Sequence, residues 1–149
     1  MTAILTAVLR IAIALWAGGV CLFTFVLTPT IFRSEDRDAA GRIVGYLFPG
    51  YFRWGLACGA VALVTVIVLR TNLRHFTAAI ALLIVMLAAT SFQAFYIEPK
   101  AAALKKEIPS FVTTPKDHPL RREFSRLHGI SAVCNLTVCV GGIVLVVLL

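Results

Sequence analysis

The side chains of this chain that are best suited to chemistry recur at helical spacing near its C-terminal end. They are His128, Ser131, Asn135, Cys139 and Gly142. Their intervals of three and four residues would place them on one stripe of a helix. An imidazole or amide without a partner is costly in hydrocarbon, so the stripe should face the interior of a helix bundle. There it could hold a ligand or form interhelical hydrogen bonds.

A second polar group should lie at the same end of the bundle. Gln93 and Glu98 close an apolar segment, and consecutive spanning helices alternate in direction, so Pro29, Pro49, Glu98 and His128 fall on one membrane face. A carboxylate beside a histidine at a wet interface could bind a cation, relay a proton or form a structural ion pair. These three alternatives stay open. The candidates for ligand or ion binding are Gln93, Glu98, His128, Ser131 and Asn135.

The elements that must position these residues are membrane-spanning helices. The chain has 149 residues, of which 60 % are hydrophobic and 14 % are charged, so it has too little polar surface for a soluble globule. Four segments reach the roughly 20 apolar residues that a spanning helix needs, at about 4–32, 51–69, 76–97 and 127–149. We therefore predict an all-α, polytopic membrane protein, a four-helix bundle that forms a single domain over residues 1–149.

A short interfacial helix is predicted between the first two spanning helices. Ser34 is followed by three acidic residues, which favour the start of a helix, and the helix should run from about Glu35 to Phe48. Pro49 and Gly50 should then break it before the chain enters the second spanning helix.

The net charge of +7 is unevenly distributed along the chain. Eleven of the 14 lysines and arginines lie in the two long connections or beside them, at positions 33–53 and 100–126, and only Arg10, Arg70 and Arg74 belong to the other side. The positive-inside rule predicts cytoplasmic long loops and outward termini. The expected membrane is a bacterial inner membrane. The expected partners are the lipid bilayer and either a second copy or a larger membrane complex, and no nucleic acid.

The small residues inside the helices have two interpretations. Cys21, Cys58, Cys134 and Cys139 lack zinc-site spacing and should fill helix contacts, although together with His128 they are the candidate ligands if a soft metal is bound. Helix packing is the predicted role of Gly18 and of the pair Gly55 and Gly59, which has GxxxG spacing. Haem held by two histidines would need a dimer, because only His128 lies in a predicted spanning helix.

Three stretches of the chain carry a family resemblance. GRIVGYLFPGYF (41–52), FYIEPKAAA (95–103) and REFSRLHGISAVCNL (122–136) resemble the signature segments of the transmembrane protein 205 family, and the first segment ending in Pro29 is compatible with it. The resemblance implies a four-helix membrane protein and, through an association with platinum resistance in eukaryotes, handling of soft metals or xenobiotics. The motif positions are Phe48, Pro49, Tyr51, Phe52, Glu98, Pro99, His128, Gly129, Ser131 and Asn135.

Three functions remain open at this point. The first is a non-enzymatic membrane protein, a small transport, permeation or accessory unit without a cofactor, whose region around Glu98, His128 and Asn135 binds a solute, ion or partner. The second is an oxidoreductase or oxygenase-like enzyme for a lipophilic substrate, with His128 as acid/base or metal ligand and a bound metal, haem or quinone. The third is a structural assembly factor that uses the GxxxG surface.

Overall fold

The computed structural model describes residues 2–149, and four long helical rods make up most of this range. The first rod comprises α1 (Thr2–Cys21), the π-helical η1 (Leu22–Leu27) and α2 (Thr28–Ser34), and the second is α3 (Arg37–Val68). The third comprises α4 (Phe76–Phe92), η2 (Gln93–Ile97) and α5 (Glu98–Glu107), and the fourth is α6 (Pro119–Leu148). Each rod is long and apolar enough to cross a membrane, so the predicted all-α, multi-pass architecture is confirmed.

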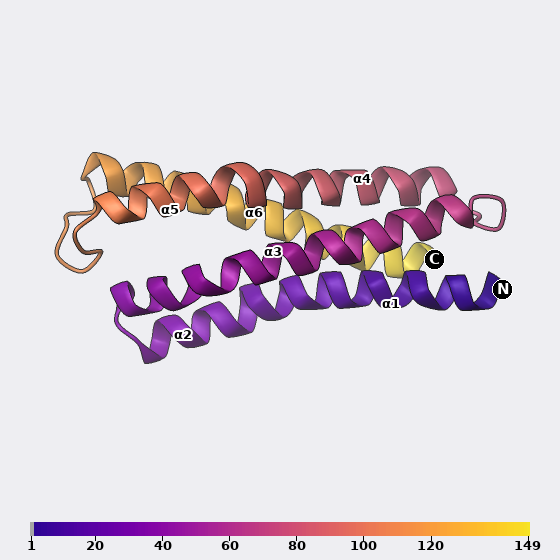
Figure 1. Ribbon diagram of the computed structural model, residues 1–149, viewed down its shortest axis with the longest axis horizontal. Coiled ribbons are helices and arrows are strands. Elements are labelled where there is room, and N and C mark those ends of the chain that lie inside the picture. The colour runs from indigo at the N-terminus through magenta and orange to yellow at the C-terminus, as the bar shows by residue number, and fades with distance from the viewer. Residues whose placement is uncertain (1) are drawn as a thin grey trace.

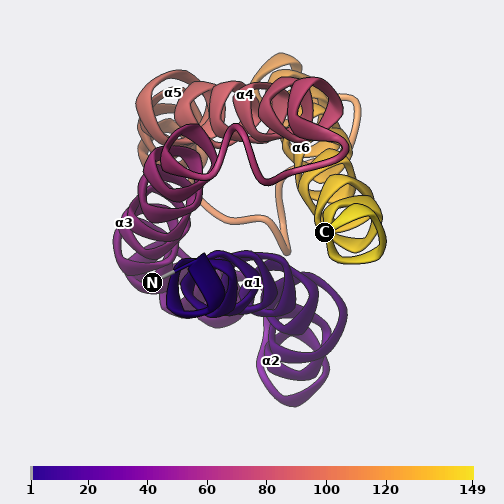
Figure 2. The ribbon, with the colours of Figure 1, turned by 90° about the vertical axis from the view of Figure 1, so that its right-hand side faces the viewer.

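The rods form a single ring in which each packs mainly against two neighbours. α1 packs against α3 and α6, and α4 packs against the same two helices from the opposite side (Figure 2). In Figure 1, α2, α5 and the long connection 108–118 lie at one end, whereas both termini and the α3–α4 connection lie at the other. We call these the loop end and the terminal end.

The apolar core fills the half of the bundle toward the terminal end. Its largest fully buried side chains include Leu9, Ile13, Trp16, Leu83, Met86 and Leu145. A Cβ atom added to Gly59 would lie 2.5 Å from Leu87 and 2.8 Å from the Trp16 ring, and one added to Gly55 would lie 3.0 Å from Trp16 Nε1. These two glycines therefore let α3 approach the indole. Gly18 faces open space, so the packing role predicted for it is wrong.

α3 differs from the sequence-based prediction. The predicted break at Pro49 and Gly50 is wrong, because α3 runs unbroken from Arg37 and includes the segment expected to form a separate interfacial helix. The proline removes one backbone hydrogen bond. Val44 and Phe52 are nevertheless buried on either side of it, so packing against the bundle continues through the proline. The helix begins one residue after Asp36, whose carboxylate accepts hydrogen bonds from the backbone N–H groups of Asp38 and Ala39.

The fourth helix also begins earlier than predicted. α6 starts at Pro119 rather than near Leu127, and proline suits the first turn of a helix because no backbone donor is needed there. Leu127 packs against Ile97 and Leu104, so this extension of α6 pairs with α5 beyond the main core. The loop end is thus built from helices that continue past the expected membrane boundary.

Candidate polar site at the two π-helical turns

Both π-helical segments lie directly before a proline. The Thr28 N–H donates to the Phe23 carbonyl, five residues earlier, and Pro29 follows. In the same way the Glu98 N–H donates to the Gln93 carbonyl, and Pro99 follows. A proline ring clashes with the carbonyl four residues before it, and a wide π turn moves that carbonyl aside. The two prolines therefore reshape their helices without ending them.

The first π turn presents Thr24 to α6. The side-chain amide of Asn135 donates to Thr24 Oγ1 over 3.1 Å, and the Tyr51 hydroxyl donates to Asn135 Oδ1 over 3.0 Å. Asn135 thereby joins the first rod to α3 inside the bundle. Its donor and its acceptor atoms are both used, as expected for an amide in hydrocarbon.

The second π turn presents Gln93 to the same helix. The Ser131 hydroxyl donates to Gln93 Oε1 over 2.7 Å, and Gln93 is only 1 % exposed. Ser131 and Asn135 lie one turn apart on α6, so this helix supplies partners to both π turns. We call the five residues Thr24, Tyr51, Gln93, Ser131 and Asn135 the polar girdle. It contains three of the predicted ligand candidates, and all four rods contribute to it.

The other two predicted candidates do not join the girdle. His128 is exposed, so its predicted interior orientation is wrong, whereas Ser131, Asn135, Cys139 and Gly142 are buried or half-buried. The buried position at that level of α6 is occupied by Leu127, because α5 packs there. Glu98 is half-buried at the start of α5. Within residues 2–149 no hydrogen bond or ion pair joins Glu98 to His128 or to Arg53.

The loop end is closed by polar contacts of other residues. The Asp38 carboxylate accepts hydrogen bonds from the Ser110 hydroxyl (2.5 Å) and from the Phe111 N–H (2.7 Å). Lys105 donates to the Gly41 carbonyl, and Arg121 donates to the Thr114 carbonyl. These contacts fix the connection 108–118 and α5 to the first turns of α3.

The cysteines occupy three separate environments. The thiols of Cys21 and Cys139 meet with their sulfurs 3.1 Å apart, Cys58 is buried on α3, and Cys134 is half-buried on α6. In the part of the chain that the structure describes, no three His, Cys, Asp or Glu side chains are grouped so that they could hold a metal ion. The candidate soft-metal ligands are therefore brought together only as the pair Cys21 and Cys139.

An aromatic cluster surrounds the proline of α3. The Tyr51 ring stacks on Phe23 at 4.4 Å between centroids, and Phe48 stacks on Phe52 at 5.6 Å. Tyr51 is thus packed against Phe23 of the first rod and against two residues of its own LFPGYF motif, Phe48 and Phe52. Pro29 and Pro99 shape the two π turns, and Gly129 is an exposed residue of α6 that faces open space.

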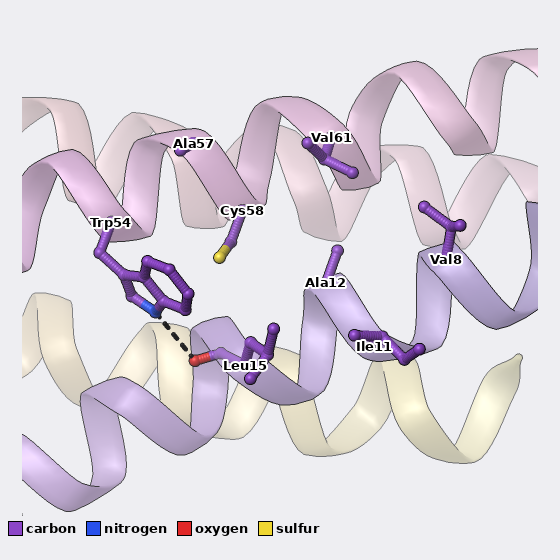
Figure 3. Close-up of a pocket in the computed structure, with 8 residues that line it drawn as sticks. All are labelled: Val8, Ile11, Ala12, Leu15, Trp54, Ala57, Cys58 and Val61. Atoms are coloured by element: carbon purple, nitrogen blue, oxygen red, sulfur yellow. Dashed lines mark hydrogen bonds between the residues drawn. The ribbon is translucent and has the colours of Figure 1, made fainter.

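Two apolar hollows lie in the groove between the first rod and α3. One, of about 330 Å³, is lined by Val8, Ile11, Ala12, Leu15, Trp54, Ala57, Cys58 and Val61 (Figure 3). The other, of about 340 Å³, is lined by Gly19, Leu22, Phe23, Leu27, Leu47, Gly50, Tyr51 and Trp54. We call the second hollow the Tyr51 groove. Tyr51 belongs both to this groove and to the polar girdle.

Trp54 separates the two hollows. Its indole N–H donates to the Leu15 carbonyl over 3.3 Å, as Figure 3 shows, and half of its surface is exposed. Trp54 is not among the site residues predicted from the sequence. The signal in the sequence that could have identified Trp54 is its spacing: it follows Tyr51 by three residues, which puts both rings on one side of α3.

Comparison with known protein families places the chain in one of them. A sequence model described as a domain of unknown function, DUF4149, matches residues 11–110. The chain belongs to the DUF4149 family. The matched region of this DUF4149 protein includes Thr24, Tyr51 and Gln93 but ends before Ser131 and Asn135. No solved structure matches the chain. The resemblance to the transmembrane protein 205 family stays a prediction.

Proposed function

We propose that this DUF4149 protein is a non-enzymatic membrane protein that binds a lipophilic solute from the bilayer and serves as a small transport or permeation unit. One observation supports the proposal above others. The Tyr51 groove is an apolar hollow between the first rod and α3, and one of its lining residues, Tyr51, donates its hydroxyl hydrogen to Asn135 of the polar girdle. A lipophilic solute in the groove would therefore lie against apolar walls, beside a residue that reaches the girdle.

The groove has space because two of its residues lack side chains. A Cβ atom added to Gly50 would meet nothing within 4 Å, and one added to Gly19 would meet only the Trp54 indole, at 3.3 Å. The walls are otherwise aliphatic and aromatic. Pockets that bind small lipophilic molecules combine such walls with a few oriented polar groups.

The polar girdle can supply a hydrogen-bonding partner for the polar group of a bound solute. Tyr51 donates to Asn135, so its oxygen remains free to accept a hydrogen bond from a ligand. Toward the terminal end the bundle is filled by Trp16, Met86 and other apolar side chains, whereas polar side chains lie toward the loop end. We therefore propose exchange of the solute between the bilayer and the loop end.

The membrane orientation is part of the proposal. Basic residues are concentrated on α2, α5, the connection 108–118 and the first turns of α3 and α6, all at the loop end (Figure 1). The positive-inside rule supports a cytoplasmic loop end in a bacterial inner membrane. The resemblance to the transmembrane protein 205 family supports a xenobiotic as cargo, and a lipophilic organic compound suits the apolar walls better than a hydrated ion does.

Fluorescence quenching of Trp54 tests solute binding. The chain has two tryptophans, and Trp16 is fully buried, so a bromine-labelled ligand should quench Trp54 selectively. The protein in liposomes is titrated with brominated stearic acid and with brominated stearyl alcohol, which have charged and neutral head groups. We expect at least one of these probes to quench the fluorescence saturably. The unbrominated form of the probe should reverse the quenching, and Trp54→Phe should abolish it.

A pair of glycine substitutions supplies the matched control. Gly50→Leu fills the groove and should abolish the saturable quenching, whereas Gly18→Leu adds the same side chain to an exposed helix face and should leave it intact. Quenching that rises linearly with both probes, or that is equal in the two variants, would show ordinary lipid contact and contradict the proposal.

A further inference from the structure

Cys21 and Cys139 are brought together from distant parts of the chain. Cys21 is the last residue of α1, Cys139 lies in the middle of α6, and their sulfurs are 3.1 Å apart. Cys139 is 4 % exposed, and both cysteines are free thiols. Neither thiol belongs to the polar girdle or lines the Tyr51 groove, so the function proposed above does not use them.

Fixed contacts on both sides hold the two thiols in register. One turn toward the terminal end, α1 and α6 are so close that a Cβ atom on Gly142 would lie 2.4 Å from the Ala17 Cβ. About one turn toward the loop end, Asn135 is hydrogen-bonded to Thr24. The helices therefore cannot separate at the thiols without breaking one of these contacts. A sulfur–sulfur bond is about 2.0 Å long, so the sulfurs need to approach by only about 1 Å.

The position of the pair restricts what can oxidise it. Cys21 lies eleven residues after Arg10 and twelve before Arg33, or about 16 Å and about 18 Å along the helix, close to the middle of a spanning segment. Water-soluble oxidants and charged thiol reagents are excluded from that depth. Oxidation of the two thiols releases two protons as well as two electrons, and both must be taken up at that depth.

We propose that Cys21 and Cys139 form a disulfide that is generated by a membrane quinone. The two S–H bonds break and one S–S bond forms. The dithiol loses two electrons and two protons, and the quinone gains them to become the hydroquinone. Quinones are lipid-soluble and take up both electrons and both protons, which meets the two requirements of the site. The product is a covalent link between α1 and α6 directly beside the Thr24–Asn135 hydrogen bond.

Counting free thiols tests the proposal. The reduced protein in liposomes is incubated anaerobically with a short-chain ubiquinone, quenched with acid, denatured and treated with a maleimide that adds a fixed mass to each thiol. We expect the number of labelled cysteines to fall from four to two, and to return to four after dithiothreitol. Peptide mass spectrometry should find the fragments containing Cys21 and Cys139 joined.

The two remaining cysteines provide the matched controls. In Cys58→Ala/Cys134→Ala the count should fall from two to zero, whereas in Cys21→Ala or Cys139→Ala it should stay at three. Helix content by circular dichroism checks that each variant folds. Four labelled thiols after quinone treatment of the wild type would overturn the proposal, and so would an equal loss of thiols in Cys21→Ala. If copper-phenanthroline forms the Cys21–Cys139 disulfide but the quinone does not, the assigned oxidant is wrong and the proposal is overturned.

Discussion

The side-chain amide of Asn135 donates a hydrogen bond to the Thr24 hydroxyl over 3.1 Å and thereby connects α6 to a π-helical turn of the first rod. The same amide accepts a hydrogen bond from Tyr51 on α3. One side chain thus holds three of the four rods together, and one of its partners, Tyr51, also lines the Tyr51 groove. The proposed binding role and the stability of the bundle both depend on it.

Removal of the Asn135 amide should destabilise the bundle. Asn135→Leu leaves the Thr24 and Tyr51 hydroxyls without their partner, and interhelical hydrogen bonds in membranes contribute roughly 0.6–2 kcal/mol each. We expect a loss of about 1–3 kcal/mol in the free energy of unfolding, measured by steric trapping or by titration with denaturing detergent. Thr137→Val is the control, because Thr137 bonds only to the Val133 carbonyl of its own helix. Equal losses in the two variants would show that the interhelical bonds contribute nothing.

The proline after the second π turn should act through Gln93. Pro99→Ala permits an ordinary α-helical turn, which would rotate Gln93 away from Ser131. In a double-mutant cycle, Pro99→Ala and Ser131→Ala should therefore couple by about 0.5–1.5 kcal/mol in unfolding free energy. Pro99→Ala combined with Thr137→Val should be additive. If the first pair is additive as well, the proline does not position Gln93.

Substitution by alanine should have different effects on stability at Gly59 and at Gly18. Gly59→Ala places a methyl group 2.5 Å from Leu87 and against the Trp16 ring, and overpacking of this kind costs about 1–3 kcal/mol. Gly18→Ala meets no atoms within 4 Å and should leave stability unchanged or raise it by up to about 1 kcal/mol, because alanine favours the helix. Thermal unfolding in detergent measures both variants. Similar shifts in midpoint temperature would contradict the packing derived for α3 and the Trp16 indole.

The contact between Asp38 and the connection 108–118 should control protease access. Asp38→Ala removes the acceptor of the Ser110 hydroxyl and the Phe111 N–H, and hydrogen bonds to a charged group are stronger than those between neutral groups. We expect trypsin to cleave after Lys116 about tenfold faster or more. Thr113→Ala, at an exposed position in the same connection, should leave the rate of cleavage unchanged. An unchanged rate in Asp38→Ala would mean that other contacts order this connection.

Apolar segment length was sufficient to predict the four spanning rods, because hydrocarbon requires long runs of apolar residues whatever their packing. Helical spacing also predicted that Ser131 and Asn135 face the interior. Helical spacing also assigned His128 to this stripe, although His128 lies at its edge. At that level of α6 the side chain that faces the bundle is Leu127, because α5 packs against it. Which neighbour covers an edge position is a tertiary property that periodicity does not contain.

Prolines had two different outcomes that local rules could not separate. Pro49 was expected to break a helix but lies inside α3, because burial continues on both sides of it. Pro29 and Pro99 each follow a π turn, which changes the hydrogen-bond register without any sign in the hydrophobic pattern. The Tyr51 groove was likewise not predictable, since it depends on the space left where η1 faces Gly50 of α3.

Photo-crosslinking tests most directly whether a lipophilic solute occupies the Tyr51 groove. The protein in liposomes is irradiated with a diazirine-labelled fatty acid or fatty alcohol, with and without excess unlabelled competitor, and the modified residues are mapped by mass spectrometry. The proposed function predicts competitor-sensitive labelling concentrated in residues 19–27 and 47–54, which line the groove, and its loss in Gly50→Leu. Labelling that is insensitive to competitor and spread equally over exposed positions such as Val133, Val140 and Val147 would contradict it.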